Sequence, residues 1–293
     1  MVVKQLFIVN PTAGNGEAGK QWPEIARLIE QNFQGYEFSF TQRPGHATEL
    51  ARDGVLKGFD TIVSCGGDGT LNEVINGVAG SEVSVGIIPL GTGSDFGKTV
   101  GIKSVEDSIA VLKGNKKERV DTASVTFDES GDSRHFINIL EIGFGAEVMR
   151  YVNSHSKHGR NSFLIGVLSV LMKLKKFAVK TDSENKNELE TIEVIVANGK
   201  YFGGGMLASP GSIIKDGILD VHILKPVSRL TTLFRLRNLM NGTYIEKNFS
   251  YEDKVSSISF LEKGNLVEVD GEVVGTTPVS IRVSDKGVNF ILP

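Results

Sequence analysis

Three glycine-rich loops, each of which follows a short apolar run, constrain the fold of this chain more than any other feature. The loops span 14–20, 66–70 and 91–97, and the apolar runs before them span 6–10, 61–65 and 83–89. Stretches with helical periodicity separate these units, at 22–34, 46–57, 71–78 and 105–113. Short apolar strands that alternate with amphipathic helices are typical of a parallel sheet covered on both faces. In such sheets, ligands bind at the loops that follow the carboxyl ends of the strands.

The pattern changes after Asp121. From there the chain is rich in strand-like segments, which are interrupted by helical periodicity only near 162–177 and 230–240. This change predicts a Rossmann-like α/β domain over residues 1–122 and an antiparallel β domain over residues 123–286. The tail 287–293 is a candidate to return to the first domain.

Composition limits the classes of partner and the compartment. The 32 basic and 35 acidic residues give a net charge of −3, so no overall positive field argues for nucleic acid as a partner. The single cysteine, Cys65, lies in an apolar run and cannot form an internal disulfide. No stretch reaches the roughly 18 apolar residues of a membrane span, and the N-terminus lacks a signal peptide pattern. We therefore expect a cytoplasmic protein.

The first glycine-rich loop matches two nucleotide-binding patterns, but the residues around it lack what each pattern requires. Gly14–Lys20 fits both G-x-G-x-x-G and the start of a P-loop. A P-loop needs Ser or Thr after the lysine, where this chain has Gln21. A dinucleotide site needs an acid at the end of the second strand, which ends at Thr41 and Gln42. We interpret Gly14–Lys20 as a flexible connection before a helix at Trp22.

The second loop carries stronger signals for phosphate chemistry. Gly66, Gly67 and Gly69 allow the backbone to approach phosphates, and the N–H groups of a helix N-terminus favour their charge. Asp68 would repel phosphates unless a metal ion or a transferable proton lies between them, so we assign it to metal or acid–base work. The alternative is that Asp68 and Thr70 only cap the helix.

The third loop repeats this chemistry one strand later, with Asp95. Neighbouring strands lie about 4.8 Å apart, so Asp68 and Asp95 could reach one metal ion. Asp121 is a candidate third ligand, and its alternative is an ordinary exposed acid in a loop.

Together these residues resemble the catalytic-domain family of diacylglycerol kinases, with its bacterial lipid-kinase branch and the related sphingosine and ceramide kinases. The resemblance covers nearly the whole chain, and an ordered set of this kind is far more specific than any one motif. Its segments are Asn10–Gly14, Gly66–Glu73, Gly91–Phe96, Asn198–Met206 and Asp216–Val221.

The resemblance implies a nucleotide-binding domain followed by a β-sandwich, with ATP and Mg²⁺ as cofactors and a lipid alcohol as the acceptor. It implies that Asp68, Asp95 and Asp121 gather around catalytic Mg²⁺, and that Asp216 lies near a structural cation. Nucleotide contacts are expected from Asn10, Pro11, Thr41, Gly66, Gly67, Asp68, Gly69, Thr70, Asn72, Glu73, Gly91, Thr92, Gly93 and Ser94. Ser94 replaces the asparagine that is usual in the family.

The general base is expected in the late acidic motif Asp270-Gly271-Glu272, where the family places it. The residues alone favour another interpretation, because Asp-Gly between Val269 and Val273 is ordinary hairpin chemistry. The resemblance does not decide between Asp270 and Glu272.

The segment 148–181 contains seven basic residues and no acidic residue. Because an apolar run lies between the basic residues, the segment suits the surface of an anionic membrane, which would make the protein peripheral at the inner face. The alternative is a helix packed on the β domain with a solvated basic end.

Two other functions remain open at the level of sequence. NAD kinases also carry Gly-Gly-Asp-Gly-Thr, although the loop Gly91–Phe96 and the glycine cluster Tyr201–Met206 match the lipid branch. A module that binds nucleotide or lipid without catalysis is the second alternative, and the retained acids argue against it. The sequence identifies neither the acceptor lipid nor the oligomeric state, and it leaves a homodimer open.

Overall fold

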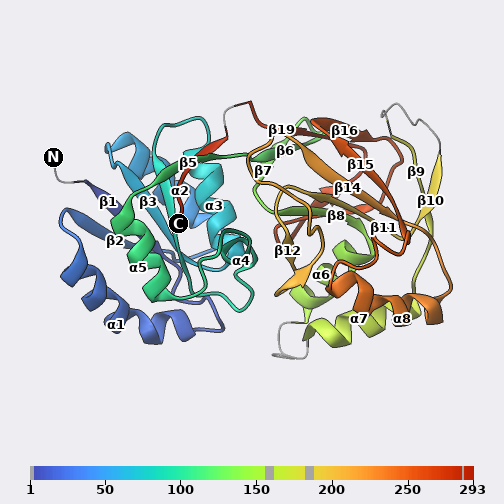
Figure 1. The fold of residues 1–293 in the computed structure, drawn as a ribbon, viewed down its shortest axis with the longest axis horizontal. Helices are drawn as coiled ribbons and strands as arrows, with labels where there is room; N and C mark the ends of the chain where they lie inside the picture. Colours follow the sequence, from blue (N-terminus) through green and yellow to red (C-terminus); the bar gives the residue numbers. More distant parts are fainter. Residues whose placement is uncertain (1–2, 156–161, 182–187, 286) are drawn as a thin grey trace. The chain divides into compact units, whose positions relative to one another are not determined.

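The computed structural model describes residues 3–155, 162–181, 188–285 and 287–293. The chain forms two compact units, drawn in Figure 1. The first consists of residues 1–122, 203–205 and 284–293, and the second of residues 123–202 and 206–283.

The first domain is built on a sheet with strand order β2-β1-β3-β4-β20-β5. Neighbouring strands run parallel, except that β5 is antiparallel to β20. The strands are β1 (Gln5–Val9), β2 (Tyr36–Phe40), β3 (Thr61–Gly66), β4 (Ser84–Pro89), β5 (Lys117–Val120) and β20 (Val288–Ile291). The predicted parallel sheet is confirmed, and the last strand of the chain lies within it.

Helices cover this sheet on both faces because its strands are apolar on both faces. The helices are α1 (Glu17–Asn32), α2 (His46–Leu56), α3 (Asp68–Val78), α4 (Asp95–Val100) and α5 (Val105–Gly114). Helices α1 and α5 share a core with alternate residues of β1 and β3, such as Phe7 and Val63, whereas α2 packs on Leu6 and Ile62 through Gly54. This alternation follows from the period of two residues in a strand.

Helix α1 begins five residues earlier than the sequence predicts. Gly16 enters the helix with φ 87°, and Gly19 packs against the carbonyl of Pro11, where an added Cβ would lie only 2.9 Å from the oxygen. The segment 17–20 is therefore the first turn of the helix and not a flexible connection. Glycine is required there because the two backbone segments touch.

The second domain is a β-sandwich, and the predicted fold class is confirmed. One sheet has the order β15-β14-β11-β8-β17-β18, and the facing sheet has the order β16-β19-β6-β7, all pairs antiparallel. Their strands are β6 (Ala123–Phe127), β7 (Ser133–Phe136), β8 (Ile139–Gly143), β11 (Glu193–Ala197), β14 (Leu219–Leu224), β15 (Ser250–Val255), β16 (Ser257–Phe260), β17 (Leu266–Val269), β18 (Glu272–Thr276) and β19 (Val279–Val283).

Smaller elements complete this domain. Two short ribbons pair β9 (Phe177–Val179) with β10 (Leu189–Thr191), and β12 (Tyr201–Phe202) with β13 (Met206–Leu207). Its helices are α6 (Phe144–Ser154), α7 (Ser162–Met172) and α8 (Arg229–Met240). No helix among the described residues is long and apolar enough to cross a bilayer. Lys157 and Arg160, two of the basic residues singled out in the sequence, lie outside the described residues.

The core of the sandwich uses one face of each sheet. Leu140 and Ile142 of β8 and Val194 of β11 point into it and meet Val125 and Ile281 from the facing sheet. The residues between them, including Glu141, therefore point to the other face of the larger sheet. Helix α6 lies against that face, because an added Cβ on its Gly145 would meet the Glu141 carboxylate.

Candidate functional site

The second and third glycine-rich loops of the first domain touch each other through their backbones. Strand β3 ends at Gly66 and α3 begins at Asp68, so a single residue, Gly67, connects them. A Cβ on Gly91 would lie 2.4 Å from the Cα of Gly67. This close approach requires glycine, and it brings the carboxyl ends of β3 and β4 together as predicted.

Asp68 caps the helix of the neighbouring loop. Its Oδ2 accepts a hydrogen bond from the backbone N–H of Asp95 at 3.0 Å, and its Oδ1 accepts one from Phe96 at 3.0 Å. These two N–H groups are at the start of α4, where unpaired donors favour a negative charge. The capping interpretation of Asp68 is therefore correct in kind, but the helix is α4 and not α3.

Asp95 lies beside Asp68 and is buried. Its Oδ1 is 3.1 Å from the Lys98 ammonium, and its Oδ2 accepts a hydrogen bond from the backbone of Gly204 at 2.8 Å. Burial raises the pKa of Asp95, the Asp68 charge raises it further, and the Gly204 and Lys98 contacts oppose the shift. A Cβ on Gly93 would lie 3.5 Å from Oδ2 of both aspartates. The two carboxylates therefore border the same small space.

This pair of carboxylates suits a magnesium ion that shares its coordination with a substrate. Mg²⁺ prefers oxygen ligands and is commonly held by one or two carboxylates together with substrate phosphates. Within the described ranges, no group of three or more His, Cys, Asp or Glu side chains is arranged to hold a metal ion by itself. The donors present fit an ion that arrives with phosphates.

Asp121 does not join this pair. It follows β5, which runs antiparallel to β20, and the last residue of β5, Val120, pairs with the first residue of β20. Strand β20 in turn is parallel to β4, with Asn289 beside Ser84 at the start of that strand. Asp121 therefore lies at the edge where β4 begins, opposite to the edge that carries Asp68 and Asp95. The expectation that all three surround one ion is not met in this domain.

The first loop is tied to the second by side chains. Asn10 donates from Nδ2 to the Thr70 hydroxyl at 3.0 Å and accepts at Oδ1 from the backbone N–H of Thr12 at 3.1 Å. The backbone N–H of Thr41 donates to the carbonyl of Val9 at 2.8 Å, at the end of β1. Asn10, Pro11 and Thr41 thus lie at the same edge of the sheet as the other two loops.

Two residues expected at the nucleotide have other partners in the structure. Both carboxylate oxygens of Glu73 accept backbone hydrogen bonds at the start of α2, from Gly45 at 2.8 Å and from Ala47 at 2.9 Å. Asn72 is almost fully buried. The Glu73 contacts link α3 to the start of α2, whereas Asn72 accepts hydrogen bonds from Asn76 within α3.

Ser94 adopts a left-handed conformation with φ 48° directly before α4, and Thr92 is exposed. Among residues other than glycine, asparagine and aspartate tolerate this conformation best. Ser94 therefore replaces the usual asparagine at a position whose left-handed backbone conformation favours asparagine.

In the second domain, Asp270 and Gly271 form the turn between β17 and β18. Both have positive φ, 47° and 97°, as a two-residue hairpin turn of this kind requires. The Asp270 carboxylate accepts three backbone hydrogen bonds, from Ile137 at 3.1 Å and from Asn138 and Ile139 at 3.0 Å each. These hydrogen bonds fix the backbone of residues 137–139, where the chain enters β8.

The Glu272 carboxylate is more exposed than that of Asp270 and does not hold the backbone in the same way. Its side chain is 54% exposed, and its Oε2 is 2.6 Å from the Arg134 guanidinium. Arg134 also lines a hollow of about 410 Å³ with neighbouring residues of β7 and β18. Asp216 is exposed as well and accepts the backbone N–H of Ile218 at 3.2 Å in a local turn.

Sequence reasoning missed a cluster of buried glutamates on the outer face of the larger sheet. Glu268 of β17 pairs directly with Glu141 of β8, and Glu193 of β11 accepts the Gly145 N–H at 2.6 Å. Burial raises the pKa of all three carboxyls, and their mutual repulsion adds to the shift. The available signal was an acid inside each apolar strand, as in Ile139-Leu140-Glu141-Ile142.

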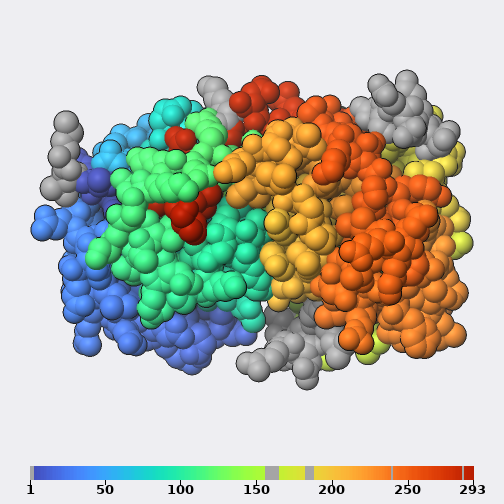
Figure 2. All heavy atoms as spheres, viewed as in Figure 1, coloured from blue at the N-terminus to red at the C-terminus, as the bar shows by residue number. Residues whose placement is uncertain are grey.

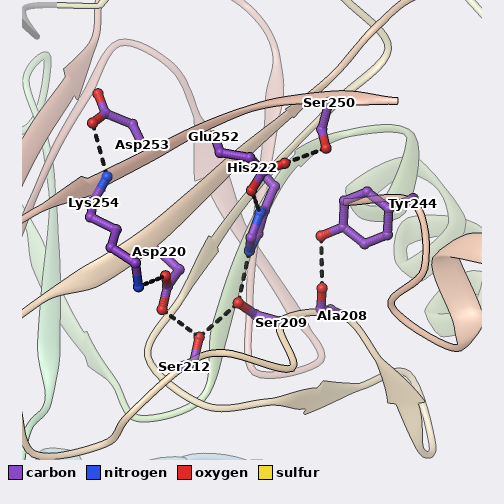
Figure 3. A network of polar contacts seen from close by, with 10 residues as sticks. All are labelled: Ala208, Ser209, Ser212, Asp220, His222, Tyr244, Ser250, Glu252, Asp253 and Lys254. Atoms are coloured by element: carbon purple, nitrogen blue, oxygen red, sulfur yellow. Dashed lines mark hydrogen bonds and ion pairs between the residues drawn. The ribbon is translucent and has the colours of Figure 1, made fainter. Parts of the chain in front are cut away.

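A second missed feature is the polar network in Figure 3, which links the loop after β13 to strands β14 and β15. The Ser209 hydroxyl is 2.7 Å from Nε2 of His222, whose Nδ1 contacts Glu252. This order of Ser, His and Glu is that of an activated nucleophile. Ser209 is only 1% exposed, and Ser212 links it to Asp220, so the network fixes the loop.

Comparisons with known proteins match both domains. The model of the diacylglycerol kinase catalytic domain matches residues 4–125, and the model of the YegS C-terminal NAD kinase beta sandwich-like domain matches residues 138–292. A diacylglycerol kinase of Bacillus subtilis is 29% identical to this chain, and the alignment covers 98% of this chain and 95% of the relative. A diacylglycerol kinase of Mycobacterium tuberculosis is 25% identical, and its alignment covers 99% of this chain and 95% of the relative. A crystal structure of a diacylglycerol kinase from Bacillus anthracis superposes with a TM-score of 0.74 at 25% identity, over 100% of this chain and 97% of that one.

Proposed function

The chain belongs to the diacylglycerol kinase catalytic-domain family of bacterial lipid kinases, and on that premise we propose that it transfers the γ-phosphate of ATP to the hydroxyl of diacylglycerol or a similar lipid alcohol, with Mg²⁺. The observation that carries the proposal is the pair of carboxylates, Asp68 and Asp95, that two touching glycine-rich loops hold beside one space. Phosphoryl transfer needs this kind of charge neutralisation more than covalent help.

The glycine-rich loops supply the phosphate site. Gly69 leaves open space beside the backbone where a side chain would lie, and the N–H groups at the start of α3 favour the negative charge of a bound phosphate. The contact between Asn10 and Thr70 fixes the hydroxyl of the second loop against the first. The nucleotide therefore meets a backbone that is already in place, which reduces the entropy cost of ordering it on binding.

Asp68 and Asp95 would hold the metal ion, which supplies neutralisation of the phosphate charge when bound. The backbone hydrogen bonds that Asp68 accepts at the start of α4 hold its carboxylate in a fixed orientation. Asp95 lies against Lys98 and Gly204, so its orientation is also fixed.

For the general base we propose Glu272, with Asp270 as the residue that positions it. A base must be able to take a proton, and the exposed carboxylate of Glu272 has a single ion pair, with Arg134. The three backbone hydrogen bonds to Asp270 occupy its carboxylate oxygens and hold the turn.

Because the acceptor is a lipid, we also propose that the protein works at the cytoplasmic surface of a membrane as a peripheral protein. The basic residues Lys173 and Lys175 follow α7 and are exposed. Each basic residue near an anionic membrane surface adds about 1 kcal/mol of attraction.

The direct test is incubation of the purified protein with labelled ATP, Mg²⁺ and a panel of lipid alcohols in detergent micelles. We expect label in diacylglycerol or a related lipid, and none after omission of Mg²⁺. NAD belongs in the same panel, because the model that matches the second domain is described as NAD kinase sandwich-like. Label in NAD and in no lipid would replace the proposal, and hydrolysis of ATP with no labelled acceptor would refute it.

A further inference from the structure

Helix α8 turns its apolar stripe away from the protein. Leu230, Leu233 and Phe234 lie at the spacing of one helix face, and their exposed fractions are 71%, 40% and 79%. An apolar stripe at this spacing normally faces a core. The opposite face carries the buried Thr232 and Leu236, which packs against α7.

Helix α7, which packs beside α8, also exposes apolar side chains, over a shorter stretch. Leu168 and Met172 are four residues apart and are 46% and 71% exposed, whereas Val167 and Leu171 are buried against α6. Figure 1 shows α7 and α8 adjacent in the second domain, and in Figure 2 the atoms of α8 belong to the orange region, together with those of its neighbours in the sequence.

We call this pair of helix faces the α7–α8 apolar surface. Among the described residues, eleven large hydrophobic side chains are exposed, and six of them lie on these two helices. Scattered exposed hydrophobic residues need no explanation, but a concentration on two packed helices marks an interaction site. Its members are Leu168, Met172, Leu230, Leu233, Phe234 and Met240.

Basic residues predominate on and beside these two helices. The sequence has no acidic residue from 148 to 181 or from 226 to 245. Lys173, Lys175, Arg229 and Arg237 are exposed at the ends or along the sides of the two helices. Lys176 and Arg235 have partners of their own, Glu190 and the ring of Phe249. The surface therefore combines exposed apolar side chains with basic residues.

An anionic lipid bilayer complements both properties. Apolar side chains enter the boundary between head groups and acyl chains, and the surrounding cations remain among the phosphates. A second copy of this chain complements them poorly, because two such surfaces would bring like charges together.

We propose that the α7–α8 apolar surface inserts shallowly into an anionic membrane and holds the protein there during catalysis. The inference rests on the proposed function in one respect, because a lipid acceptor gives the membrane contact its purpose. It assigns the apolar part of the contact to Phe234 and its neighbours on α8, in addition to the lysines after α7.

The test uses the full chain with Leu233→Ser and Phe234→Ser combined. Binding is measured by sedimentation with vesicles of phosphatidylglycerol and phosphatidylcholine. We expect the double variant to lose roughly tenfold or more in vesicle affinity, because two large apolar side chains no longer leave water. Its melting temperature should not fall, since both side chains are exposed.

Leu56→Ser is the matched control. Leu56 is 85% exposed on α2 of the first domain, so the same chemical change there should leave vesicle affinity unaltered. A second variant, Phe234→Trp in a Trp22→Phe background, gives a single indole whose emission should shift to the blue and be quenched by brominated lipid. Vesicle affinity equal to wild type in the double variant, or an indole that vesicles do not affect, overturns the proposal.

Two further measurements separate this inference from the proposed function. Sedimentation velocity without lipid reports self-association, and a dimer that the double variant dissociates would assign the surface to a second copy and overturn the proposal. Turnover of a short-chain, water-soluble diacylglycerol reports the chemistry alone. We expect the double variant to retain it, so that loss of membrane binding and loss of kinase activity are observed independently.

Discussion

The two domains bury acidic side chains in different ways. In the first domain, Asp68 and Asp95 lie at the start of α4, where backbone N–H groups and Lys98 surround them. In the second domain, Glu141, Glu193 and Glu268 lie close together on a buried sheet face, where Glu193 accepts the Gly145 N–H at the start of α6. Burial raises the pKa of Asp95 and of the three glutamates alike, but Asp95 has the Lys98 ammonium beside it, whereas the glutamates repel one another. The two groups of acids therefore differ in the charge beside them and not in burial.

The largest effect in this comparison should come from Asp68→Asn. We expect phosphoryl transfer to fall by about 10³-fold or more, because the change removes a charge that is needed once phosphates and Mg²⁺ are present. Asparagine keeps one acceptor but presents an NH₂ group to the N–H groups of α4, so a stability loss of about 1 kcal/mol should accompany it. Turnover and thermal unfolding measure the two effects. Wild-type turnover in the folded variant would remove Asp68 from the site.

The second prediction separates Glu272 from Asp270. Glu272→Gln should lower turnover by at least about 10²-fold with little change in unfolding midpoint, because the side chain is exposed. Asp270→Asn should lower stability by about 1–3 kcal/mol, since at least one of its backbone donors loses its acceptor. Full activity in Glu272→Gln, combined with inactivity of a stable Asp270→Asn, would reverse the assignment.

The third prediction concerns competition between protons and the metal at Asp95. Burial and the neighbouring Asp68 raise the pKa of Asp95, so its carboxyl takes up a proton earlier than an ordinary aspartate as the pH falls. We expect the affinity for Mg²⁺ with a non-hydrolysable ATP analogue to drop below that pKa, by up to about tenfold per pH unit. Calorimetric titration across pH measures this drop. Asp95→Asn should bind weakly at every pH, and an equal slope in that variant would contradict the prediction.

The smallest effect should come from the glutamate cluster. The pKa of Glu268 is raised in the folded protein, so the folded state holds more protons than the unfolded state above the ordinary value of 4.5. Stability from this group is therefore complete below that value and decreases as the pH rises towards the folded pKa. Glu268→Gln should flatten this dependence and add on the order of 1 kcal/mol at pH 8. Chemical denaturation at pH 5 and pH 8 measures it, and an unchanged pH slope would contradict it.

The sequence was sufficient for the features that local patterns determine. Apolar runs and glycine positions predicted the parallel sheet, and the glycine contents of 66–70 and 91–97 predicted that Asp68 and Asp95 would lie together. Asp121 was placed wrongly because its position depends on β5 pairing with β20, a strand from the far end of the chain. The burial of Glu141 and the outward face of α8 depend on which neighbours cover each surface, and no short pattern records that.

Strand β20 has a consequence for the order in which the molecule is made. It lies between β4 and β5, so the sheet of the first domain cannot be completed until residues 288–291 have left the ribosome. The edge of β4 that pairs with β20 stays unpaired while the second domain is synthesised. Unpaired strand edges of this kind can associate with other chains. Translation that stops short of β20 therefore leaves the β4 edge without its partner strand.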